Sequence, residues 1–297
     1  MAFKIVLTEV SSPFAKALLR ELEHHTFSVV LPGAAGVLAA EPGVLVDTRA
    51  YAGIEVAHEI DTVPDSALPI IHISSGEVFQ ATGTAVGFHE QDAPNGSSPR
   101  ALALIAAEAR ALERSKTLVL RLPLLVDVRV GDWFSGLLER LSREAVLSVS
   151  ETARLDPVCI KEACRVVIAM VQQIACGAEN WGVMHLRSAE PCFEAEFADH
   201  LVRQLKKDNW PAARLDVSKG PSVLYGPMSV LAGRRLTDAF GVQMRSWRLG
   251  VKALLQRWMD ERRQLELALS SNPPLSSDAQ AGLNNSPQSA PTQHSAL

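Results

Sequence analysis

The sequence predicts an α/β protein whose mostly parallel sheet is covered by helices. Short apolar stretches of strand length alternate along the chain with amphipathic stretches of helix length, which is typical of parallel strands joined by helical connections. The strand candidates are short and rich in Ile, Leu and Val, as expected for strands that are buried on both faces. With 297 residues, 47% of them apolar, the chain is long enough to bury a large core.

The N-terminal half carries most of the predicted sheet. The strand candidates are residues 4–8, 27–31, 44–46, 68–74 and 117–122. Helices are expected at residues 14–22 and 101–114, where apolar side chains recur at helical spacing. Only one short strand fits between the first helix and Val44, and nine residues separate Glu59 from Pro69. We therefore expect a truncated sheet.

The C-terminal half is mainly helical by its spacing of apolar residues. Helices are expected near residues 133–141, 160–174, 197–205 and 248–269, with one strand at 184–186. From residue 270 the chain has no Lys or Arg and many Ser, Pro, Asn and Gln residues, a composition that cannot form a core. We predict a core domain at 1–125, a smaller α/β region at 126–269 partly interleaved with it, and a disordered tail at 270–297.

Composition excludes several classes of function. The net charge is −4 without a long basic run, so we expect no nucleic-acid partner. No apolar run is long enough to span a membrane, and the N-terminus starts as a strand, not as a signal peptide. The four cysteines show no CxxC pair and the histidines no HExxH, so we expect reduced thiols, no metal and a cytoplasmic protein.

Five segments carry a family resemblance, in order along residues 3–255. They are KIVLTEVSSPFAKALL, VLVDTRAYAGIEVAHE, IIHISSGEVFQATGTAVGFHEQDAP, ALERSKTLVLRLPLLVD and the run from LDPVCIKEACRVVIAMV to GVMHLRSAEPCFEAEFADHLV. The later segment LAGRRLTDAFGVQMRSWRLGV fits the same pattern. Their order and spacing resemble the extended short-chain dehydrogenases/reductases, and among these the dTDP-4-dehydrorhamnose reductase family. The resemblance implies a Rossmann-like core that binds NAD(P), followed by a substrate region that takes a sugar nucleotide.

The cofactor loop of this family is altered here. Its three glycine positions match Glu9, Ser12 and Ala15, whereas the loop needs small residues because backbone amides must approach a pyrophosphate. Ser12 followed by Pro13 is typical of an ordinary capped helix start. We assign Thr8, Ser11 and Ser12 as a vestigial cofactor-binding position and expect no bound cofactor. Residues 33–39 form a weaker GxxGxxA alternative.

The catalytic pair of the family is also missing. Family members place a Tyr-x-x-x-Lys pair on a helix, where the lysine lowers the pKa of the phenol. The chain has two tyrosines, Tyr51 and Tyr225, and neither has a lysine four residues later. By alignment, Arg100 stands at the tyrosine position and Leu104 at the lysine position. Ser75 remains at the family's Ser/Thr position as a residual catalytic candidate, although capping a turn is its alternative role.

These losses favour a pseudoenzyme with a binding or regulatory role, comparable to the regulatory beta subunit of methionine adenosyltransferase. A protein partner would bind through the final helix or the tail, and a nucleotide sugar remains a candidate ligand. Arg49, Arg100 and Arg121 could hold a diphosphate or could form salt bridges at the surface.

Two enzymatic alternatives stay open. The first is an NAD(P)H-dependent reductase or epimerase acting on a nucleotide sugar such as dTDP-4-dehydrorhamnose. The second is an unrelated activity in which Glu77, His89, Glu90 and Asp92 supply acid–base groups, although a solvated loop is the simpler interpretation of this cluster.

Overall fold

The computed structural model describes residues 3–31, 43–49, 68–80, 87–129, 132–225 and 229–271. Residues 1–256 form one compact unit and residues 257–297 form a second. The sheet, its covering helices and the candidate site all lie in the first unit. The GxxGxxA segment at 33–39, Tyr51 and residues 272–297 of the predicted tail lie outside the described residues.

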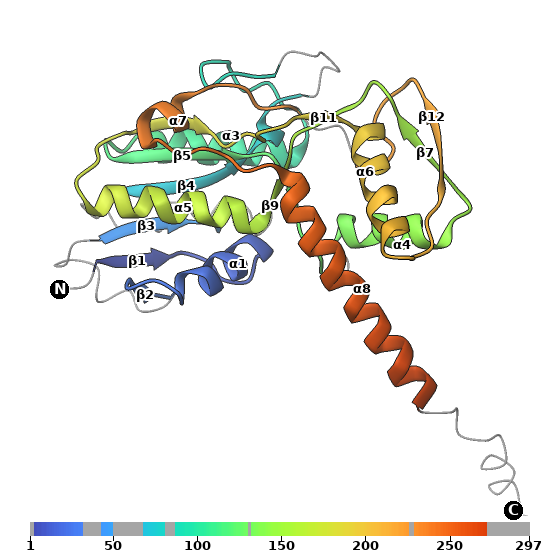
Figure 1. Ribbon diagram of the computed structural model, residues 1–297. Coiled ribbons are helices and arrows are strands. Elements are labelled where there is room, and N and C mark those ends of the chain that lie inside the picture. Colours follow the sequence, from blue (N-terminus) through green and yellow to red (C-terminus); the bar gives the residue numbers. More distant parts are fainter. Residues whose placement is uncertain are drawn as a thin grey trace, which may run out of the picture. The chain divides into compact units, whose positions relative to one another are not determined.

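A six-stranded parallel sheet forms the centre of the first unit (Figure 1). Its strands are β1 (Lys4–Leu7), β2 (Ser28–Val30), β3 (Gly43–Asp47), β4 (Ile70–Ser75), β5 (Thr117–Leu122) and β10 (Gly182–His185). They lie in the order β10-β5-β4-β3-β1-β2, and each neighbouring pair is parallel. Every residue of β3, β4 and β5 is buried. The prediction of a mostly parallel, Rossmann-like sheet is confirmed.

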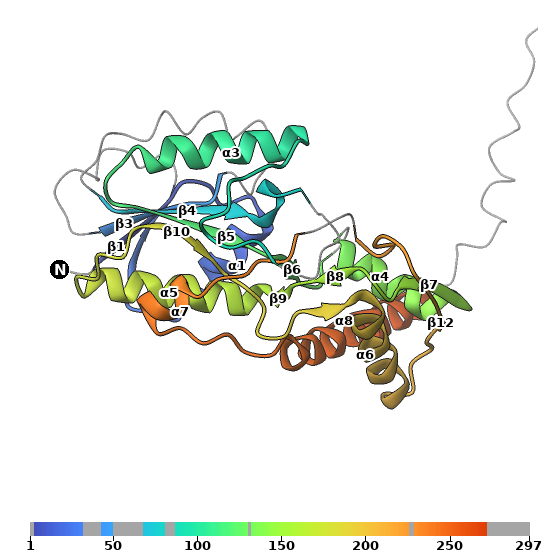
Figure 2. The same ribbon diagram turned by 90° about the horizontal axis from the view of Figure 1, so that it is seen from above.

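Helices cover both faces of this sheet (Figure 2). Helix α3 (Pro99–Leu112) packs on β4 and β5, whereas α1 (Pro13–Leu22) and α5 (Ile160–Ala175) pack together on the opposite face. Both α1 and α3 begin with Ser-Pro: the hydroxyl of Ser12 accepts the amide of Ala15 at 3.1 Å, and Ser98 caps α3 in the same way. The predicted capped start of the first helix is therefore confirmed.

A smaller set of elements stands beside the carboxyl edge of the sheet. Helix α6 (Glu194–Lys207) packs against β7 (Val146–Ser150) and β12 (Arg214–Ser218), which pair in parallel. Helix α4 (Trp133–Arg143) precedes β7. Because α5 and β10 return to the central layers, the C-terminal half is interleaved with the core; the division at residue 125 stays a prediction.

The remaining elements are short. They are η3 (Gly76–Val78), β6 (Leu124–Val126) paired with β9 (Pro157–Cys159), β8 (Arg154–Leu155) paired with β11 (Cys192–Phe193), and α7 (Arg235–Phe240). Helix α8 (Trp247–Ser271) runs past the start predicted for the tail. Among the described residues, no helix has the length and apolar character needed to cross a membrane.

Candidate functional site

The order in which strands are added to the sheet reverses between β1 and β3. From β1 the chain continues to β2 on one side, whereas β3 and β4 lie on the other side. In open parallel sheets, ligands bind outside the carboxyl ends of the strands at such a switch point. Thr8 and Glu9 follow β1 at this point, and Asp47 ends β3. These three residues therefore stand where the fold would receive a ligand.

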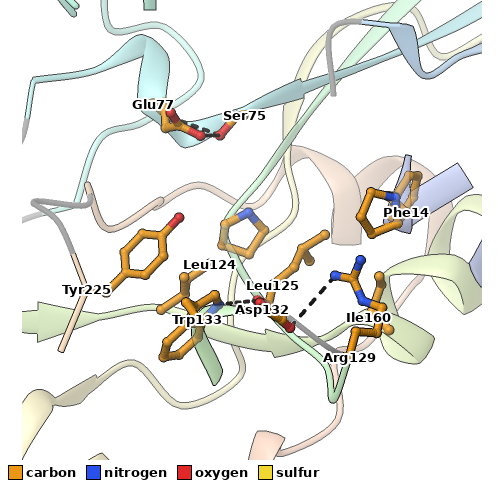
Figure 3. A pocket seen from close by; sticks show the side chains of 12 residues that line it. Phe14, Ser75, Glu77, Leu124, Leu125, Arg129, Asp132, Trp133, Ile160 and Tyr225 are labelled. Carbon is orange, nitrogen blue, oxygen red and sulfur yellow. Dashed lines mark hydrogen bonds and ion pairs between the residues drawn. The ribbon is translucent and has the colours of Figure 1, made fainter. Parts of the chain in front are cut away.

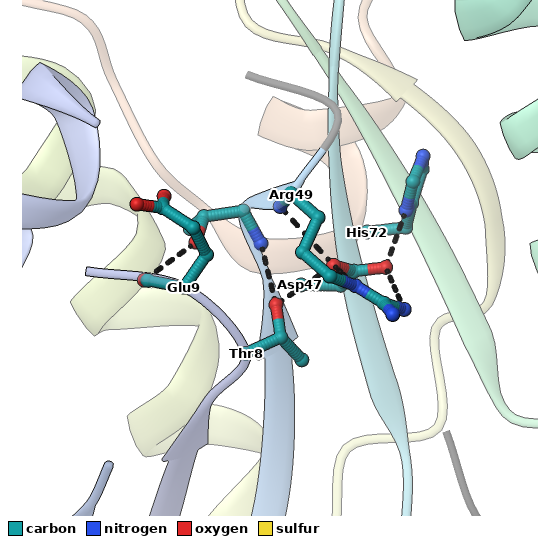
Figure 4. Close-up of polar contacts among 6 residues, drawn as sticks. Thr8, Glu9, Asp47, Arg49 and His72 are labelled. Carbon is teal, nitrogen blue, oxygen red and sulfur yellow. Dashed lines mark hydrogen bonds and ion pairs between the residues drawn. The ribbon is translucent and has the colours of Figure 1, made fainter. Parts of the chain in front are cut away.

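Asp47 is the centre of a buried polar network at the switch point (Figure 4). Its Oδ1 accepts hydrogen bonds from Thr8 Oγ1 at 2.8 Å and Arg49 Nε at 3.0 Å, and its Oδ2 lies 3.1 Å from His72 Nδ1. Burial by itself would raise the pKa of Asp47, but His72 and Arg49 outweigh burial and hold that pKa well below its ordinary value. Arg49 is thus committed to an ion pair within the protein.

The carboxylate of Glu9 accepts hydrogen bonds from the backbone N–H groups that precede α1. Its Oε1 accepts hydrogen bonds from the backbone N–H groups of Ser11 and Ser12, the latter at 2.7 Å. Burial raises the pKa of Glu9, but the hydrogen bonds from Ser11 and Ser12 outweigh burial, so this pKa is lowered overall. Pro13 at the first helical position has no N–H to offer. The helix end that binds phosphate in Rossmann folds therefore already holds a carboxylate of the chain itself.

The residues present do not fit a dinucleotide pyrophosphate in this arrangement. The predicted cofactor residues Thr8, Ser11 and Ser12 do come together at the switch point, but each is engaged within the protein. The Thr8 hydroxyl donates to Asp47, the amides of Ser11 and Ser12 donate to Glu9, and the Ser12 hydroxyl caps α1. Their role in cofactor binding stays a prediction.

A cavity of about 180 Å³ lies beside the carboxyl end of β4 (Figure 3). Its polar lining consists of Ser75, Glu77, Arg129 and Asp132, its aromatic lining of Phe14, Trp133 and Tyr225, and its aliphatic lining includes Leu124 and Leu125. This volume is several times the roughly 30 Å³ that one water takes in the liquid, so the cavity can receive part of a small organic ligand.

One wall of the cavity is built around Ser75. The Ser75 hydroxyl accepts the backbone N–H of Glu77 at 3.2 Å and donates to Glu77 Oε1 at 3.2 Å. Glu77 Oε2 in turn lies 3.0 Å from Arg100 Nε. The expected turn-capping role of Ser75 is therefore confirmed, and its catalytic role stays a prediction. Arg100 and Ser75 thus contact the same carboxylate, that of Glu77.

All three arginines form the salt bridges that were one of their two predicted roles, but Arg49 and Arg121 are buried and do not lie at the surface as expected. Arg49 pairs with Asp47 and Arg100 pairs with Glu77, as described above. Arg121 donates to both oxygens of Glu108, whose Oε1 also accepts the hydroxyl of Ser74 at 2.6 Å. This buried cluster lies behind β4 and supports the strand end that carries Ser75.

The opposite wall of the cavity is aromatic. The rings of Trp133 and Tyr225 meet edge to face with centroids 5.1 Å apart, and Trp133 Nε1 donates to the carbonyl oxygen of Leu125 at 3.1 Å. Beside them, Arg129 lies 3.8 Å from Asp132, and burial raises the pKa of that aspartate. Aromatic rings together with charged groups can bind a ligand that has both C–H faces and hydroxyl groups.

Sequence reasoning missed this second wall. Trp133 has the spacing of a core residue on a helical stripe, and Tyr225 has no lysine partner in sequence. A usable signal was the family resemblance, which assigns residues after 126 to the substrate side. No local pattern indicates that Tyr225 faces Ser75 across a cavity.

The proposed acid–base cluster does not assemble at the cavity. Of its members only Glu77 lines the cavity. Glu90 is buried and accepts the amide of Arg235 at 3.1 Å, so its assignment to a solvated loop is wrong, whereas His89 and Asp92 are exposed. Within the described ranges, no three His, Cys, Asp or Glu side chains gather as a metal site.

The strand order, the helices on both faces and the polar switch point define a doubly wound, Rossmann-like α/β protein. The chain belongs to the RmlD substrate binding domain family, whose model matches residues 53–259. It is thus a member of a sugar-nucleotide reductase-like family, as its sequence segments predict. No curated protein matches the sequence closely enough to identify a relative.

Solved structures show the same fold. The dTDP-4-dehydrorhamnose reductase of Clostridium acetobutylicum is 16% identical with a TM-score of 0.67, and the match covers 86% of this chain and 100% of that one. The Bacillus anthracis reductase in complex with NADP is 15% identical with a TM-score of 0.68, covering 86% and 99%. RMD of Pseudomonas aeruginosa, in complex with NADPH, is 15% identical with a TM-score of 0.66, covering 88% and 100%.

Proposed function

We propose that this protein binds a nucleotide sugar and receives its sugar ring in the cavity between Ser75 and Tyr225. The observation that carries the proposal is the cavity itself, which joins the carboxyl end of β4 to an aromatic wall from the substrate region. Membership of a family described as a substrate binding domain supports the same ligand class. Trp133 and Tyr225 offer faces for sugar C–H groups, and Glu77, Arg129 and Asp132 offer partners for hydroxyl groups.

Reduction or epimerisation of that sugar with NAD(P)H is the first candidate activity. It is favoured by the family and by the similar structures, two of which are complexes with NADP or NADPH. For this candidate, Glu9 has to release the amides of Ser11 and Ser12 before a pyrophosphate can bind there. The expectation of no cofactor, made from the sequence, conflicts with this evidence from relatives and is put to the test below.

Binding without turnover is the second candidate. It is favoured by the carboxylate of Glu9 at the start of α1 and by the Arg100 and Leu104 side chains in place of the family's catalytic pair. In this case the protein would have a regulatory role, with a protein partner recognised through the final helix or the tail.

Calorimetric titration of the full chain with dTDP-glucose and UDP-glucose tests the shared proposal. We expect saturable binding that weakens at least tenfold in Trp133→Ala, which removes one aromatic face. Trp210→Ala is the matched control, because Trp210 follows α6 and does not line the cavity. No binding by the folded wild-type protein, or an equal loss in both variants, would overturn the proposal.

A second assay separates the two candidates. Purified protein is mixed with dTDP-4-dehydrorhamnose and NADPH or NADH, and the absorbance of the reduced nicotinamide is followed. Consumption that saturates with the sugar supports the reductase. Sugar binding without consumption, even at millimolar cofactor, supports the binding role.

A further inference from the structure

A buried carboxylate holds the loop that carries Tyr225. Glu194, the first residue of α6, is fully buried. Its Oε2 accepts the backbone N–H groups of Val223 at 3.0 Å and Leu224 at 3.2 Å, and it also accepts the hydroxyl of Ser222. The Oε1 accepts the amide of Ser150 at 2.8 Å, which ties the same carboxylate to the end of β7.

No helix or strand fixes the conformation of the described loop residues. Residues 222–225 belong to no helix or strand, and Val223 is 53% exposed. The amide of Tyr225 donates to the Ser222 hydroxyl at 3.3 Å, and that hydroxyl donates to Glu194, so the backbone position of Tyr225 also depends on Glu194. Because hydrogen bonds to a charged acceptor are about twice as strong as neutral ones, the carboxylate is the main anchor of this segment.

The anchored loop directs the Tyr225 side chain into the cavity. Its ring packs edge to face on Trp133, and its phenol oxygen points toward the side on which Ser75 and Glu77 lie (Figure 3). The phenol of Tyr225 and the side chains of Ser75 and Glu77 therefore line the same cavity, and Arg100 of α3 pairs with Glu77.

We propose that Tyr225 is a ligand-facing residue of the sugar cavity and that Glu194 is the residue that positions it. This inference rests on the proposed nucleotide-sugar binding. The phenol would donate a hydrogen bond to a hydroxyl or carbonyl oxygen of the sugar, and its ring would complete an aromatic corner with Trp133.

The electrostatic surroundings keep the phenol in its donating form. Burial raises the pKa of Tyr225 above its ordinary value; Glu77 and Asp132 raise it further, and Arg100 lowers it. Arg129 lines the same cavity and pairs with Asp127 at 2.9 Å and with Asp132 at 3.8 Å. With its pKa raised, the phenol remains protonated at neutral pH and can donate a hydrogen bond.

Fluorine NMR of protein labelled with 3-fluorotyrosine tests the positioning role. The chain has two tyrosines, so Tyr51→Phe assigns the resonance of Tyr225. In the wild type, we expect the Tyr225 resonance to titrate at a higher pH than in the unfolded protein. In Glu194→Gln, which keeps the size but loses the charge, we expect this titration to move back toward the unfolded value.

Glu196→Gln is the matched control, because Glu196 lies two residues after Glu194 in α6 and pairs with Arg248 at the surface. We expect its titration to match that of the wild type. If Glu194→Gln does not fold, Ser222→Ala removes one hydrogen-bond donor to Glu194 and should shift the titration of Tyr225 in the same direction. An unchanged titration in a folded Glu194→Gln protein would refute the positioning role.

Ligand titration tests the ligand-facing role. Tyr225→Phe and Glu194→Gln should each weaken binding of the nucleotide sugar about two- to tenfold, the range that corresponds to the loss of one hydrogen bond. Equal affinity of the wild type and Tyr225→Phe would refute this inference and leave the cavity proposal standing. Absence of sugar binding in the wild type would refute the proposed function, while the NMR titration would still test whether Glu194 positions Tyr225.

Discussion

Removing the Glu9 carboxylate should open the start of α1 to anions. In the wild type, this carboxylate accepts the amides of Ser11 and Ser12, the latter at 2.7 Å. A phosphate bound at the same amides would lie close to the Glu9 carboxylate. Two unit charges at about 4 Å repel by about 1 kcal/mol in water and about 4 kcal/mol at an effective dielectric of about 20. Glu9→Ala should therefore raise the affinity for NADPH by roughly one to three decades.

The matched control is Glu23→Ala, which removes one exposed carboxylate at the other end of α1. Nicotinamide fluorescence and the thermal midpoint are recorded over a range of NADPH concentrations for the wild type and both variants. Because a ligand stabilises by RT ln(1 + [L]/Kd), tighter binding appears as a larger rise of the midpoint at equal NADPH. We expect this larger rise in Glu9→Ala and not in Glu23→Ala.

Two results would refute the reasoning. One is a folded Glu9→Ala protein that binds NADPH no better than the wild type, because the carboxylate would then not compete with phosphate. The other is tight NADPH binding by the wild type with no gain in the variant. In that case Glu9 moves aside at negligible cost.

Three further outcomes follow from the described structure. Arg121→Met should lower the free energy of unfolding by about 3–5 kcal/mol in urea titrations, because it leaves the buried carboxylate of Glu108 without its cation; a loss below 1 kcal/mol would contradict this. Burial raises the pKa of Asp156 to about 7, so the contribution of Asp156 to the free energy of unfolding is present below about pH 4 and is lost as the pH rises to about 7. Asp156→Asn should lessen this loss of stability between about pH 4 and 7, and a pH profile of stability equal to that of the wild type would contradict the prediction. Ellman's reagent should modify only Cys176 in the native protein and all four cysteines after unfolding, since the other three are buried; fast native modification of a second thiol would be inconsistent with the packing.

Most of the central sheet could be predicted from the sequence. The runs that form β1, β4 and β5 are rich in Ile, Leu and Val because both faces of a parallel sheet are covered, and this signal is local. The strands outside the central sheet, such as β8 and β11, were not predicted. Their pairing joins segments far apart in the chain, and a two-residue strand has no period to recognise.

The candidate site could be predicted only on the sheet side. Ser75 and the start of α1 were located because strand ends and helix caps are encoded within a few neighbouring residues. Trp133 and Tyr225 were not located, since their place in the cavity depends on how α4 and the loop after β12 pack beside the sheet.

The amino-acid sequence alone determined the parallel α/β class, the capped start of α1 and the lack of a Tyr-x-x-x-Lys pair, because periodicity, capping and residue spacing are short-range properties. Only the tertiary structure decided that the Glu9 carboxylate turns back onto the amides of α1 and that Glu194 holds the Tyr225 loop. Side-chain orientation and contacts between residues 28 or more positions apart depend on packing, and packing has no local signature in the sequence.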